Sequence, residues 1–477
     1  MVGNAELKLQ NSCFVAESHS SPILSALSKK ASSPPSVRPD MPTVSIHTLG
    51  CKLNFAESGT LERQFQDRHY DIVPFGSPAD VTVINTCTVT EEADRKCRQV
   101  IRRAIRSNSE TFVVVTGCYA QLQPDEIAAI PGVDAVLGAN EKLQLFKYID
   151  AFNKNEETQV SVSCIDDINA FGPAYASGDR TRAFLKVQDG CDYVCSFCTI
   201  PFARGKSRSA AIADIVRQAH EIGDAGYKEI VISGVNIGLF GADTEEKFMD
   251  LIAALDEVES IERFRISSIE PNLLTDDIID FVAGSDRFMP HFHMPLQSGD
   301  DDILGKMKRR YRSDRYRDRV RRIKATMPHA CIGVDVIVGF PGETDVHFQN
   351  THDFLMDLPV SYLHVFSYSE RPLSSATSIE TKFSVPKSVR SNRNAALRLF
   401  SERKRTAFYA ENLGTDRPVL WEHSDKSGYQ LGFTDNYIRV ERAFDALTVS
   451  DLEMVWLDTI SARGNVEIGK PEFISLT

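Results

Sequence analysis

Short runs of apolar, β-branched residues alternate with amphipathic stretches over the first third of the chain. The runs have the length of buried strands, and the amphipathic stretches carry apolar residues at the spacing of a helix face. This alternation predicts a small α/β domain with a parallel sheet over residues 41–150. The expected strands are Thr43–Leu49, Val81–Asn85, Phe112–Thr116 and Ala135–Leu137, and the expected helices are Glu57–Asp67, Glu91–Arg106 and Pro124–Ala129.

A strand–helix unit then repeats six times over residues 175–385. Six such units predict an open (β/α)6 barrel, a partial form of the TIM architecture, in which chemistry lies at the carboxyl ends of the strands. The expected strands are Ala183–Val187, Glu229–Ser233, Phe264–Ser268, His291–Pro295, Gly333–Val338 and Tyr362–Tyr368. The expected helices between them include Ala211–Ile222, Phe248–Val258, Asp276–Val282 and Ser313–Thr326.

The two ends of the chain differ from this α/β core. Residues 386–405 are polar and basic and predict a linking helix, and residues 406–477 predict a small all-β module with strands Val419–Glu422, Asn436–Arg442 and Glu453–Thr459. Residues 1–40 have the composition of a disordered tail, and Met41 is a plausible true start. The predicted fold class is therefore α/β, with a parallel N-terminal domain, a central barrel and a C-terminal β module.

Composition narrows the functional classes. A hydrophobic share of 42% and a charged share of 25% are ordinary for a soluble protein, and no apolar run approaches the length of a membrane span. The first forty residues lack the contiguous apolar region of a secretory signal, so we expect a cytoplasmic protein. The net charge of −12 excludes a uniformly basic nucleic-acid binder.

The positive charge is nevertheless concentrated in two runs. Residues 303–324 hold eleven Lys or Arg against two Asp, and a second basic run covers Arg95–Arg106. Local basic faces on an acidic protein can contact a phosphate backbone, although they can also be solvated helix faces. The candidate RNA contacts are Lys308, Arg309, Arg310 and Arg312.

Three cysteines carry the strongest chemical signal. Cys191, Cys195 and Cys198 have the spacing C-x3-C-x2-C within one short loop after the first barrel strand. Three thiolates can hold three irons of a 4Fe–4S cluster, and the fourth iron is then open to the amino and carboxylate groups of S-adenosylmethionine (SAM). A structural zinc site is the alternative, but zinc sites favour paired C-x2-C knuckles and four ligands, and no fourth ligand lies nearby in the sequence.

A second group of cysteines is dispersed in the N-terminal domain. Cys51, Cys87 and Cys118 each follow an expected strand, and the carboxyl ends of parallel strands meet along one edge of the sheet. They are either buried structural cysteines or the ligands of a second cluster. Their positions in loops favour the second cluster. The remaining cysteines have no partner spacing and are expected not to be ligands: Cys13, Cys97, Cys164 and Cys331.

Longer motifs around these cysteines resemble one enzyme family, the radical-SAM methylthiotransferases. The resemblance covers residues 41–477 and is closest to the subgroup that acts on N6-threonylcarbamoyladenosine in tRNA. The motifs in family order are Thr48–Asn54, Asn85–Thr90, Gly117–Gln121, Lys186–Cys191, Cys198–Pro201, Ile266–Glu270, Pro295–Gly299, Asp335–Glu343 and, more weakly, Gly432–Val440. The subgroup features are Asn85–Thr90, Arg95–Lys96, Arg98–Arg103 and Met307–Tyr311.

The resemblance implies a reaction and its cofactors. It implies two 4Fe–4S clusters and SAM, with Cys191, Cys195 and Cys198 holding the cluster that cleaves SAM. The auxiliary cluster on Cys51, Cys87 and Cys118 would supply methylated sulfur to C2 of the adenosine beside the anticodon. Because that C–H bond is unactivated, its cleavage requires a cofactor rather than a side-chain acid or base. The implied partners are tRNA, held in part by a C-terminal TRAM-like module, and a low-potential electron donor such as flavodoxin or ferredoxin, with the protein acting as a monomer.

Other substrates stay open at this point. They are isopentenyladenosine in tRNA and an aspartyl residue of a ribosomal protein. A different class of protein is also possible, a non-catalytic RNA-binding protein that carries iron–sulfur clusters. Several residues at strand ends are candidates for contact with SAM: Phe197, Gly234, Asn236, Ser268, Glu270 and Gln297. Ser298 and Asp335 are expected at the same rim. His291 and His293 alternate within a strand and are expected to be ordinary half-buried histidines.

Overall fold

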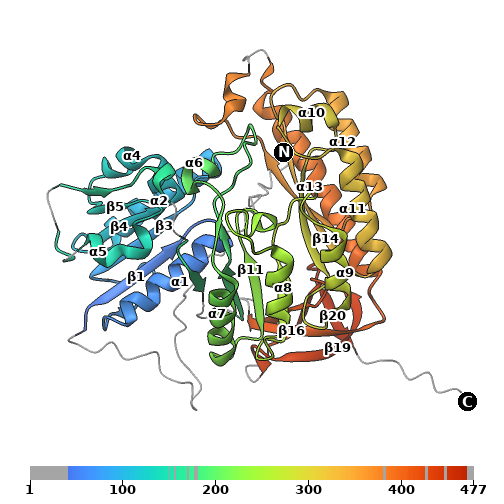
Figure 1. The fold of residues 1–477 in the computed structure, drawn as a ribbon, viewed down its shortest axis with the longest axis horizontal. Helices are drawn as coiled ribbons and strands as arrows, with labels where there is room; N and C mark the ends of the chain where they lie inside the picture. The colour runs from blue at the N-terminus through green and yellow to red at the C-terminus, as the bar shows by residue number, and fades with distance from the viewer. Residues whose placement is uncertain are drawn as a thin grey trace, which may run out of the picture. The chain divides into compact units, whose positions relative to one another are not determined.

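The computed structural model describes residues 41–149, 151–154, 157–168, 171–176, 181–379, 383–424, 428–444 and 448–469. The described chain forms two compact units (Figure 1). One contains the residues up to Thr88 together with Glu92–Ser163, and the other contains Val89–Glu91 and the residues from Cys164 onward. The expected N-terminal tail lies outside the described residues.

The first unit is built on a six-stranded parallel sheet in the order β2-β1-β3-β4-β5-β6. This confirms the parallel α/β domain expected from the alternation of strands and helices. The strands are β1 Thr43–Thr48, β2 Asp71–Ile72, β3 Val81–Thr86, β4 Phe112–Gly117, β5 Ala135–Leu137 and β6 Gln159–Ser161. The helices are α1 Lys52–Gln66, α2 Glu91–Ser107, α3 Cys118–Leu122, α4 Pro124–Ala128 and α5 Leu145–Tyr148.

Strands β3 and β4 are apolar at successive positions because both faces of the sheet are covered. Val83 and Val114 pack into one hydrophobic cluster, whereas Ile84 and Val113 pack into another on the opposite face. A strand buried on both sides has no solvent face on which a polar alternation could appear. The carboxyl ends of these buried strands are therefore fixed in position.

The second unit contains the six strands expected of the barrel. Three of them form the parallel order β12-β11-β8, to which an additional strand β7 pairs antiparallel, and the other three form a parallel sheet β13-β14-β15. Isolated bridges Phe264↔Phe288 and Ser268↔His293 connect the two sheets. The strands are β7 Ala174–Ala176, β8 Arg182–Lys186, β11 Glu229–Ser233, β12 Arg263–Ile266, β13 His291–Gln297, β14 Cys331–Val338 and β15 Tyr362–Ser367, with a short pair β9 Gln188–Asp189 and β10 Arg208–Ser209.

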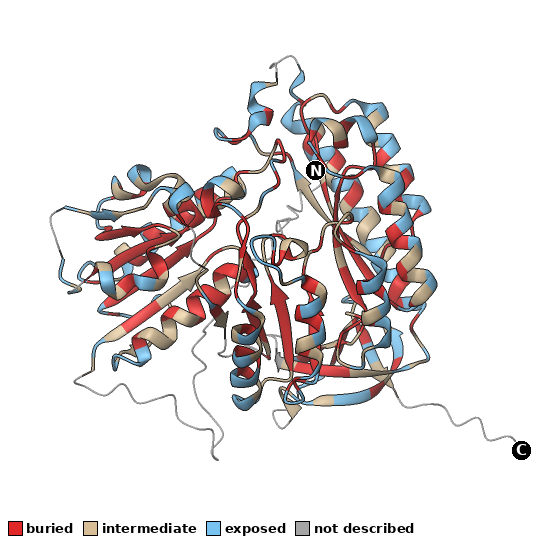
Figure 2. Ribbon diagram, in the orientation of Figure 1, coloured by how far each residue is buried: buried red, intermediate tan, exposed pale blue. Residues whose placement is uncertain are grey.

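Helices cover the outside of these strands. Figure 2 shows the strands largely buried and the outer helices exposed on one side. The helices are α6 Ile200–Arg204, α7 Ile212–Asp224, α8 Phe248–Asp256, α9 Asp276–Gly284, α10 Asp301–Lys306, α11 Ser313–Thr326 and α12 Asp345–Asp357. None of the helices in the described ranges is long and apolar enough to cross a membrane.

A 24-residue helix, α13 Lys387–Ala410, leads to a closed barrel in the order β16-β17-β18-β20-β19. Its strands are β16 Asp416–Ser424, β17 Tyr429–Thr434, β18 Arg439–Ala443, β19 Leu452–Ile460 and β20 Val466–Gly469. The all-β module is confirmed, but β17 and β20 were not expected. β20 has four residues, too few for an alternation to stand out.

Buried charges join the small barrel to the base of the large one. Glu229 is fully buried and accepts two hydrogen bonds from Arg265, at 3.0 and 3.2 Å. Arg265 also donates to the backbone oxygen of Asp435, and Arg263 donates to that of Pro418 at 2.6 Å. Burial by itself raises the pKa of Glu229, but the attraction of Arg265 and Arg182 outweighs it and the pKa is lowered. The carboxylate is therefore the counter-ion that makes this interface stable.

We expect Glu229→Gln to lower the free energy of unfolding by about 3–5 kcal/mol, because the arginines would be left as uncompensated buried charges. The matched control is Glu262→Gln, which removes an exposed pair with Lys228 and should cost at most about 1 kcal/mol. Urea unfolding of both variants measures the difference. Equal midpoints for the two would contradict this assignment.

Candidate iron–sulfur sites

The first unit brings together the three cysteines that follow its strands. Cys87 and Cys118 come directly after the ends of β3 and β4, and Cys51 lies three residues after the end of β1. The register pairs Thr48 with Asn85 and Thr86 with Gly117. The order β1-β3-β4 makes these three strands neighbours. Three thiols thus lie at one sheet edge, which is the arrangement that a cluster with three protein ligands requires.

Two glycines allow this close approach. Gly50 and Gly117 immediately precede Cys51 and Cys118, and their φ angles are 116° and 98°. A Cβ atom at Gly50 would lie 2.8 Å from the Cβ of Cys87, and one at Gly117 would lie 2.4 Å from the oxygen of Thr86. Because any side chain would both strain the backbone and collide with the neighbouring strand end, the cysteine edge depends on glycine here.

Two asparagines fasten the strand ends to one another. The side chain of Asn54, on α1, donates to the backbone oxygens of Leu49 and Thr86, at 2.8 and 2.9 Å. Asn85 donates in return to the backbone oxygen of Asn54, at 2.9 Å. Both side chains are buried, so these hydrogen bonds hold the loops of Cys51 and Cys87 side by side.

Cys97 lies beside this group although its sequence position gave no sign of it. It is buried on α2, and its thiol donates to the backbone oxygen of Cys87 at 3.3 Å. Burial raises the pKa of the Cys97 thiol to about 12. The thiol therefore supports the Cys87 loop as a neutral hydrogen-bond donor.

In the second unit, Cys191, Cys195 and Cys198 share one loop between β9 and α6. The loop is anchored by Ser196, whose backbone N–H donates to the oxygen of Met307 at 3.1 Å and whose hydroxyl donates to that of Lys306 at 2.8 Å. These oxygens lie at the carboxyl end of α10. The cysteine loop is thus held by a segment more than a hundred residues away in the chain.

Burial keeps these thiols neutral when no metal is bound. It raises the pKa of Cys191 to about 11 and that of Cys198 to about 12. In the described part of the chain, the trios whose ligand atoms lie within 4.8 Å of one another are His293–Asp335–His364 and Asp300–Asp302–His347, and neither contains a cysteine. Sulfurs around one tetrahedral zinc lie about 3.8 Å apart, and no three of the described cysteines are arranged in this way.

Arg309 lies against the sulfur of Cys195. Its side chain is 3% exposed, and one N–H donates to the Cys195 sulfur at 3.1 Å. The same guanidinium forms an ion pair with Glu270 and donates to the hydroxyl of Tyr311. A buried guanidinium cannot reach a phosphate outside the protein, so the expectation that Arg309 contacts RNA is corrected. Lys308, Arg310 and Arg312 are exposed.

We expect Arg309→Gln to lower the reduction potential of the cluster on this loop, because hydrogen bonds to the sulfurs and nearby positive charge stabilise the reduced form. A redox titration followed by electron paramagnetic resonance measures the shift. Arg312→Gln, which removes an exposed arginine from the same segment, is the control and should leave the potential unchanged. Identical potentials for the two variants would contradict the assigned contact.

The candidate SAM contacts lie around this loop with different partners. The side-chain oxygen of Asn236 is buried and has no hydrogen-bond partner among the described residues, as expected of an atom reserved for a ligand. Gln297 ends β13 with a φ of 70°, a strained conformation typical of functional positions. Gly234 directly follows the end of β11. Ser268 forms a hydrogen bond with His293, and Glu270 forms an ion pair with Arg309. Phe197 packs in the same hydrophobic cluster as Met307 and Phe340.

Comparisons with known proteins agree with this geometry. Residues 43–138 match the family described as uncharacterized protein family UPF0004, and residues 185–355 match the radical SAM superfamily. The chain is 41% identical over 410 residues to threonylcarbamoyladenosine tRNA methylthiotransferase MtaB of Bacillus subtilis, covering 84% of this chain and 90% of the relative. The chain belongs to the radical-SAM methylthiotransferase family. The expected enzyme class is thereby confirmed.

Other relatives carry two different names. The MtaB protein of Thermotoga maritima is 34% identical over 430 residues, with 89% of this chain and 96% of the relative covered. The tRNA-2-methylthio-N(6)-dimethylallyladenosine synthase of Streptomyces avermitilis is 34% identical over 358 residues, with 73% of this chain and 70% of the relative covered. Among solved structures, the radical SAM methyltransferase TsrM of Kitasatospora setae matches with a TM-score of 0.52 at 14% identity over 68% of this chain and 72% of that one, which shows a shared fold.

Membership in the radical SAM superfamily implies SAM and a 4Fe–4S cluster. The second unit fits both groups, because it offers three adjacent thiols, an N–H donor aimed at one sulfur and an unpaired amide oxygen. Sequence reasoning found the thiols through their spacing. It missed Arg309 as their neighbour, since 114 residues separate it from Cys195.

Proposed function

We propose that this protein is a tRNA methylthiotransferase that adds a methylthio group to C2 of N6-threonylcarbamoyladenosine next to the anticodon. The observation that carries the proposal is the presence of two cysteine trios, each at strand ends of its own α/β unit. A sulfur-inserting enzyme needs one site to activate the C–H bond and another to supply sulfur. The identity of 41% to a relative with this activity in its name supports the choice of substrate.

We assign the cluster-binding ligands by unit. Cys191, Cys195 and Cys198 would hold the cluster that binds SAM, which when bound would supply the radical chemistry needed at the C2–H bond. Asn236, whose side-chain oxygen has no hydrogen-bond partner among the described residues, would hold a polar group of SAM. Arg309 and Glu270 orient one another beside Cys195. The low exposure of these side chains keeps water away from a reactive site.

The auxiliary 4Fe–4S cluster is proposed on Cys51, Cys87 and Cys118. The glycines before two of these cysteines and the asparagine hydrogen bonds support it, since both features bring the strand ends close together. We also propose that a low-potential donor such as flavodoxin or ferredoxin supplies the electron, that the protein works as a monomer, and that the reaction occurs in the cytoplasm, where tRNA is modified.

Exposed basic residues near the cysteine loop support contact with the tRNA backbone. The ring of Tyr193, within that loop, lies 4.0 Å under the guanidinium of Arg310. We expect Lys308→Glu combined with Arg312→Glu to weaken tRNA binding. The slope of log K for tRNA binding against the logarithm of the salt concentration should become less steep by about 1–2. Filter binding at several salt concentrations measures this. Control substitutions at the exposed Arg217, on α7, should have no effect.

Dimethylallyladenosine in tRNA is the second candidate substrate, because a relative that is 34% identical to this chain is named as a tRNA-2-methylthio-N(6)-dimethylallyladenosine synthase. Nucleoside mass spectrometry distinguishes the two, using tRNA from a host without methylthio modifications that expresses this gene. We expect a new methylthio-threonylcarbamoyladenosine peak. A methylthio-dimethylallyladenosine peak would keep the chemistry and change the substrate, and no new peak with a cluster-loaded protein would overturn the proposal.

A further inference from the structure

Helix α2 carries the second of the two basic runs in the sequence. Six of the twelve residues from Arg95 to Arg106 are Lys or Arg, and none of the twelve is acidic. The helix begins four residues after Cys87 and connects the carboxyl end of β3 to the amino end of β4, which are parallel neighbours (Figure 1). The basic run therefore begins near the cysteine edge of the sheet and leads away from it.

The buried and the charged residues of α2 lie on opposite faces of the helix. The buried face packs against the sheet and consists of Asp94, Cys97, Ile101 and Ala104. At 100° per residue, five cations fall within about 120° of the circumference on the other side. These five residues form the basic face of α2: Arg95, Lys96, Arg102, Arg103 and Arg106. The basic face extends over about 16 Å of the helix axis.

Acidic partners are confined to the first turn of this face. Glu92 forms an ion pair with Arg95 at 2.6 Å and attracts Lys96. The three exposed arginines further along form no ion pair with any residue that the structure describes: Arg102, Arg103 and Arg106. Arg106 lies three and four residues after the other two, and like charges at these spacings destabilise a helix. An anion that covers all three would remove this repulsion.

The helical part of the other basic run is compensated. On α11, Arg319 forms an ion pair with Asp318 at 2.6 Å, and Arg322 forms one with Asp280 at 2.6 Å. The two basic runs look alike in sequence, but only α2 presents a group of arginines without carboxylates. On a protein with a net charge of −12, such a face is complementary to a polyanion.

The arginines of the basic face are held in place before any ligand arrives. The guanidinium of Arg103 lies 5.0 Å over the ring of Phe75. The Nε–H of Arg106 donates to the backbone oxygen of Arg102 at 3.2 Å, which leaves the other N–H donors of that guanidinium for a ligand. Cys97 anchors the opposite face and is fully buried. Little side-chain freedom is therefore lost when an anion binds.

We propose that the basic face of α2 binds the phosphate backbone of the tRNA substrate, on the strand that flanks the target adenosine. This inference rests on the proposed function, which places the sulfur source at the cysteine edge of the same unit. A guanidinium matches a phosphate with two parallel hydrogen bonds, and a face about 16 Å long covers several consecutive phosphates. Because phosphate contacts carry no base information, α2 supplies affinity and register rather than choice of base.

An acidic protein surface, such as one on the electron donor, is the other polyanion that would fit this face. Two observations favour RNA. The cysteine loop assigned to the SAM-binding cluster, which needs the electron, belongs to the other compact unit. The basic face has four arginines and one lysine, and arginine is the side chain best suited to phosphate.

The test measures binding of an unmodified tRNA transcript to the cluster-loaded full-length protein, by filter binding over a range of salt concentrations. Arg102→Gln, Arg103→Gln and Arg106→Gln together should weaken binding about 10- to 100-fold at low salt. The slope of log K against the logarithm of the salt concentration should become less steep by about 2–3. Lysine at the same three positions should keep the slope, because the charge is kept.

The matched control removes three exposed arginines of the second unit, each of which has an acidic partner. Binding and slope should both stay at the wild-type values in this control: Arg217→Gln, Arg315→Gln and Arg322→Gln. Equal losses in the control would overturn the inference, since binding would then follow net charge alone. Wild-type affinity and slope in the α2 glutamine variant would also overturn it.

Two further outcomes separate this inference from its alternatives. Unchanged tRNA binding together with slower turnover on reduced flavodoxin, but not on dithionite, would assign the basic face to the electron donor and overturn the inference. Equal losses with lysine and with glutamine would point to altered packing around Phe75 and would overturn it as well. If the wild type binds tRNA but forms no methylthio nucleoside, the proposed function fails, while the comparison of variants still decides whether α2 binds the backbone.

Discussion

Replacing Cys195 by alanine is expected to lower reductive cleavage of SAM more than about 100-fold, since even a change in the second shell of a metal site costs 10- to 100-fold. Two thiols cannot hold three corners of the cluster, and no other thiol is placed to substitute among the described residues near this loop. Chromatography of 5′-deoxyadenosine after reduction with dithionite measures the loss. Iron content should fall from about eight to about four per chain.

The control for this variant is Cys164→Ala, which removes an exposed thiol of the same unit and should leave both iron content and SAM cleavage unchanged. Cleavage that persists in the Cys195 variant would contradict the assignment of this loop to the SAM-binding cluster. Loss of cleavage in both variants would point to general damage to the protein rather than to a missing ligand.

Replacing Cys51, Cys87 and Cys118 together by alanine is expected to separate the two halves of the reaction. SAM cleavage should continue, because Cys191, Cys195 and Cys198 belong to another compact unit, whereas the methylthio product should disappear. Iron should again fall to about four per chain. Mass spectrometry of the nucleosides and chromatography of 5′-deoxyadenosine, run on the same reaction, measure both effects.

Cys97→Ala provides the matched control for this triple variant. Cys97 donates its thiol hydrogen to the backbone oxygen of Cys87 and is assigned no ligand role, so its loss should leave about eight irons per chain. A drop in iron equal to that of the triple variant would mean that Cys97 is itself a ligand. Methylthio product from the triple variant would contradict the proposed auxiliary cluster.

Hydrophobic patterning predicts where the cysteines lie because it predicts where strands end. The run Val81–Asn85 is apolar enough to be a buried strand, and the strand ends at Thr86, immediately before Cys87. Since parallel strands end at one edge, the sequence alone is sufficient to bring Cys51, Cys87 and Cys118 together. The same reasoning places Cys191 after the first barrel strand.

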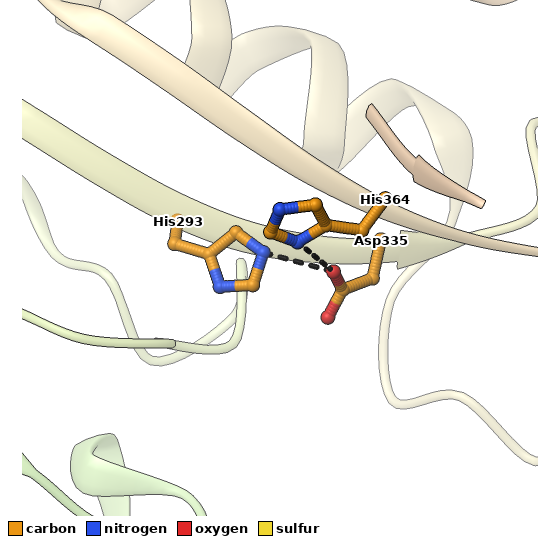
Figure 3. A group of neighbouring side chains, drawn as sticks. All are labelled: His293, Asp335 and His364. Atoms are coloured by element: carbon orange, nitrogen blue, oxygen red, sulfur yellow. Dashed lines mark hydrogen bonds and ion pairs between the residues drawn. The ribbon is translucent and has the colours of Figure 1, made fainter. Parts of the chain in front are cut away.

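Side-chain partners depend on the tertiary fold and were not predictable in this way. Arg309 belongs to a basic run that resembles a solvated surface, yet the turn after α10 directs it inward to Cys195. Asp335 was expected at the rim, whereas it lies inside β14, where His293 and His364 both hydrogen-bond one of its oxygens (Figure 3). His293 is half-buried as expected, and its two ring nitrogens hydrogen-bond Ser268, two residues after β12, and Asp335 of β14. Each of these contacts joins residues that are distant in the chain.

The most direct test of the account follows the hydrogen at C2 of the target adenosine. The purified, cluster-loaded protein is given SAM, a reductant and a threonylcarbamoyl-modified stem-loop that carries deuterium at C2. If the protein activates this bond as proposed, 5′-deoxyadenosine gains one deuterium and the RNA gains a methylthio group in its place. Unlabelled 5′-deoxyadenosine together with RNA that keeps its deuterium would contradict the central claim.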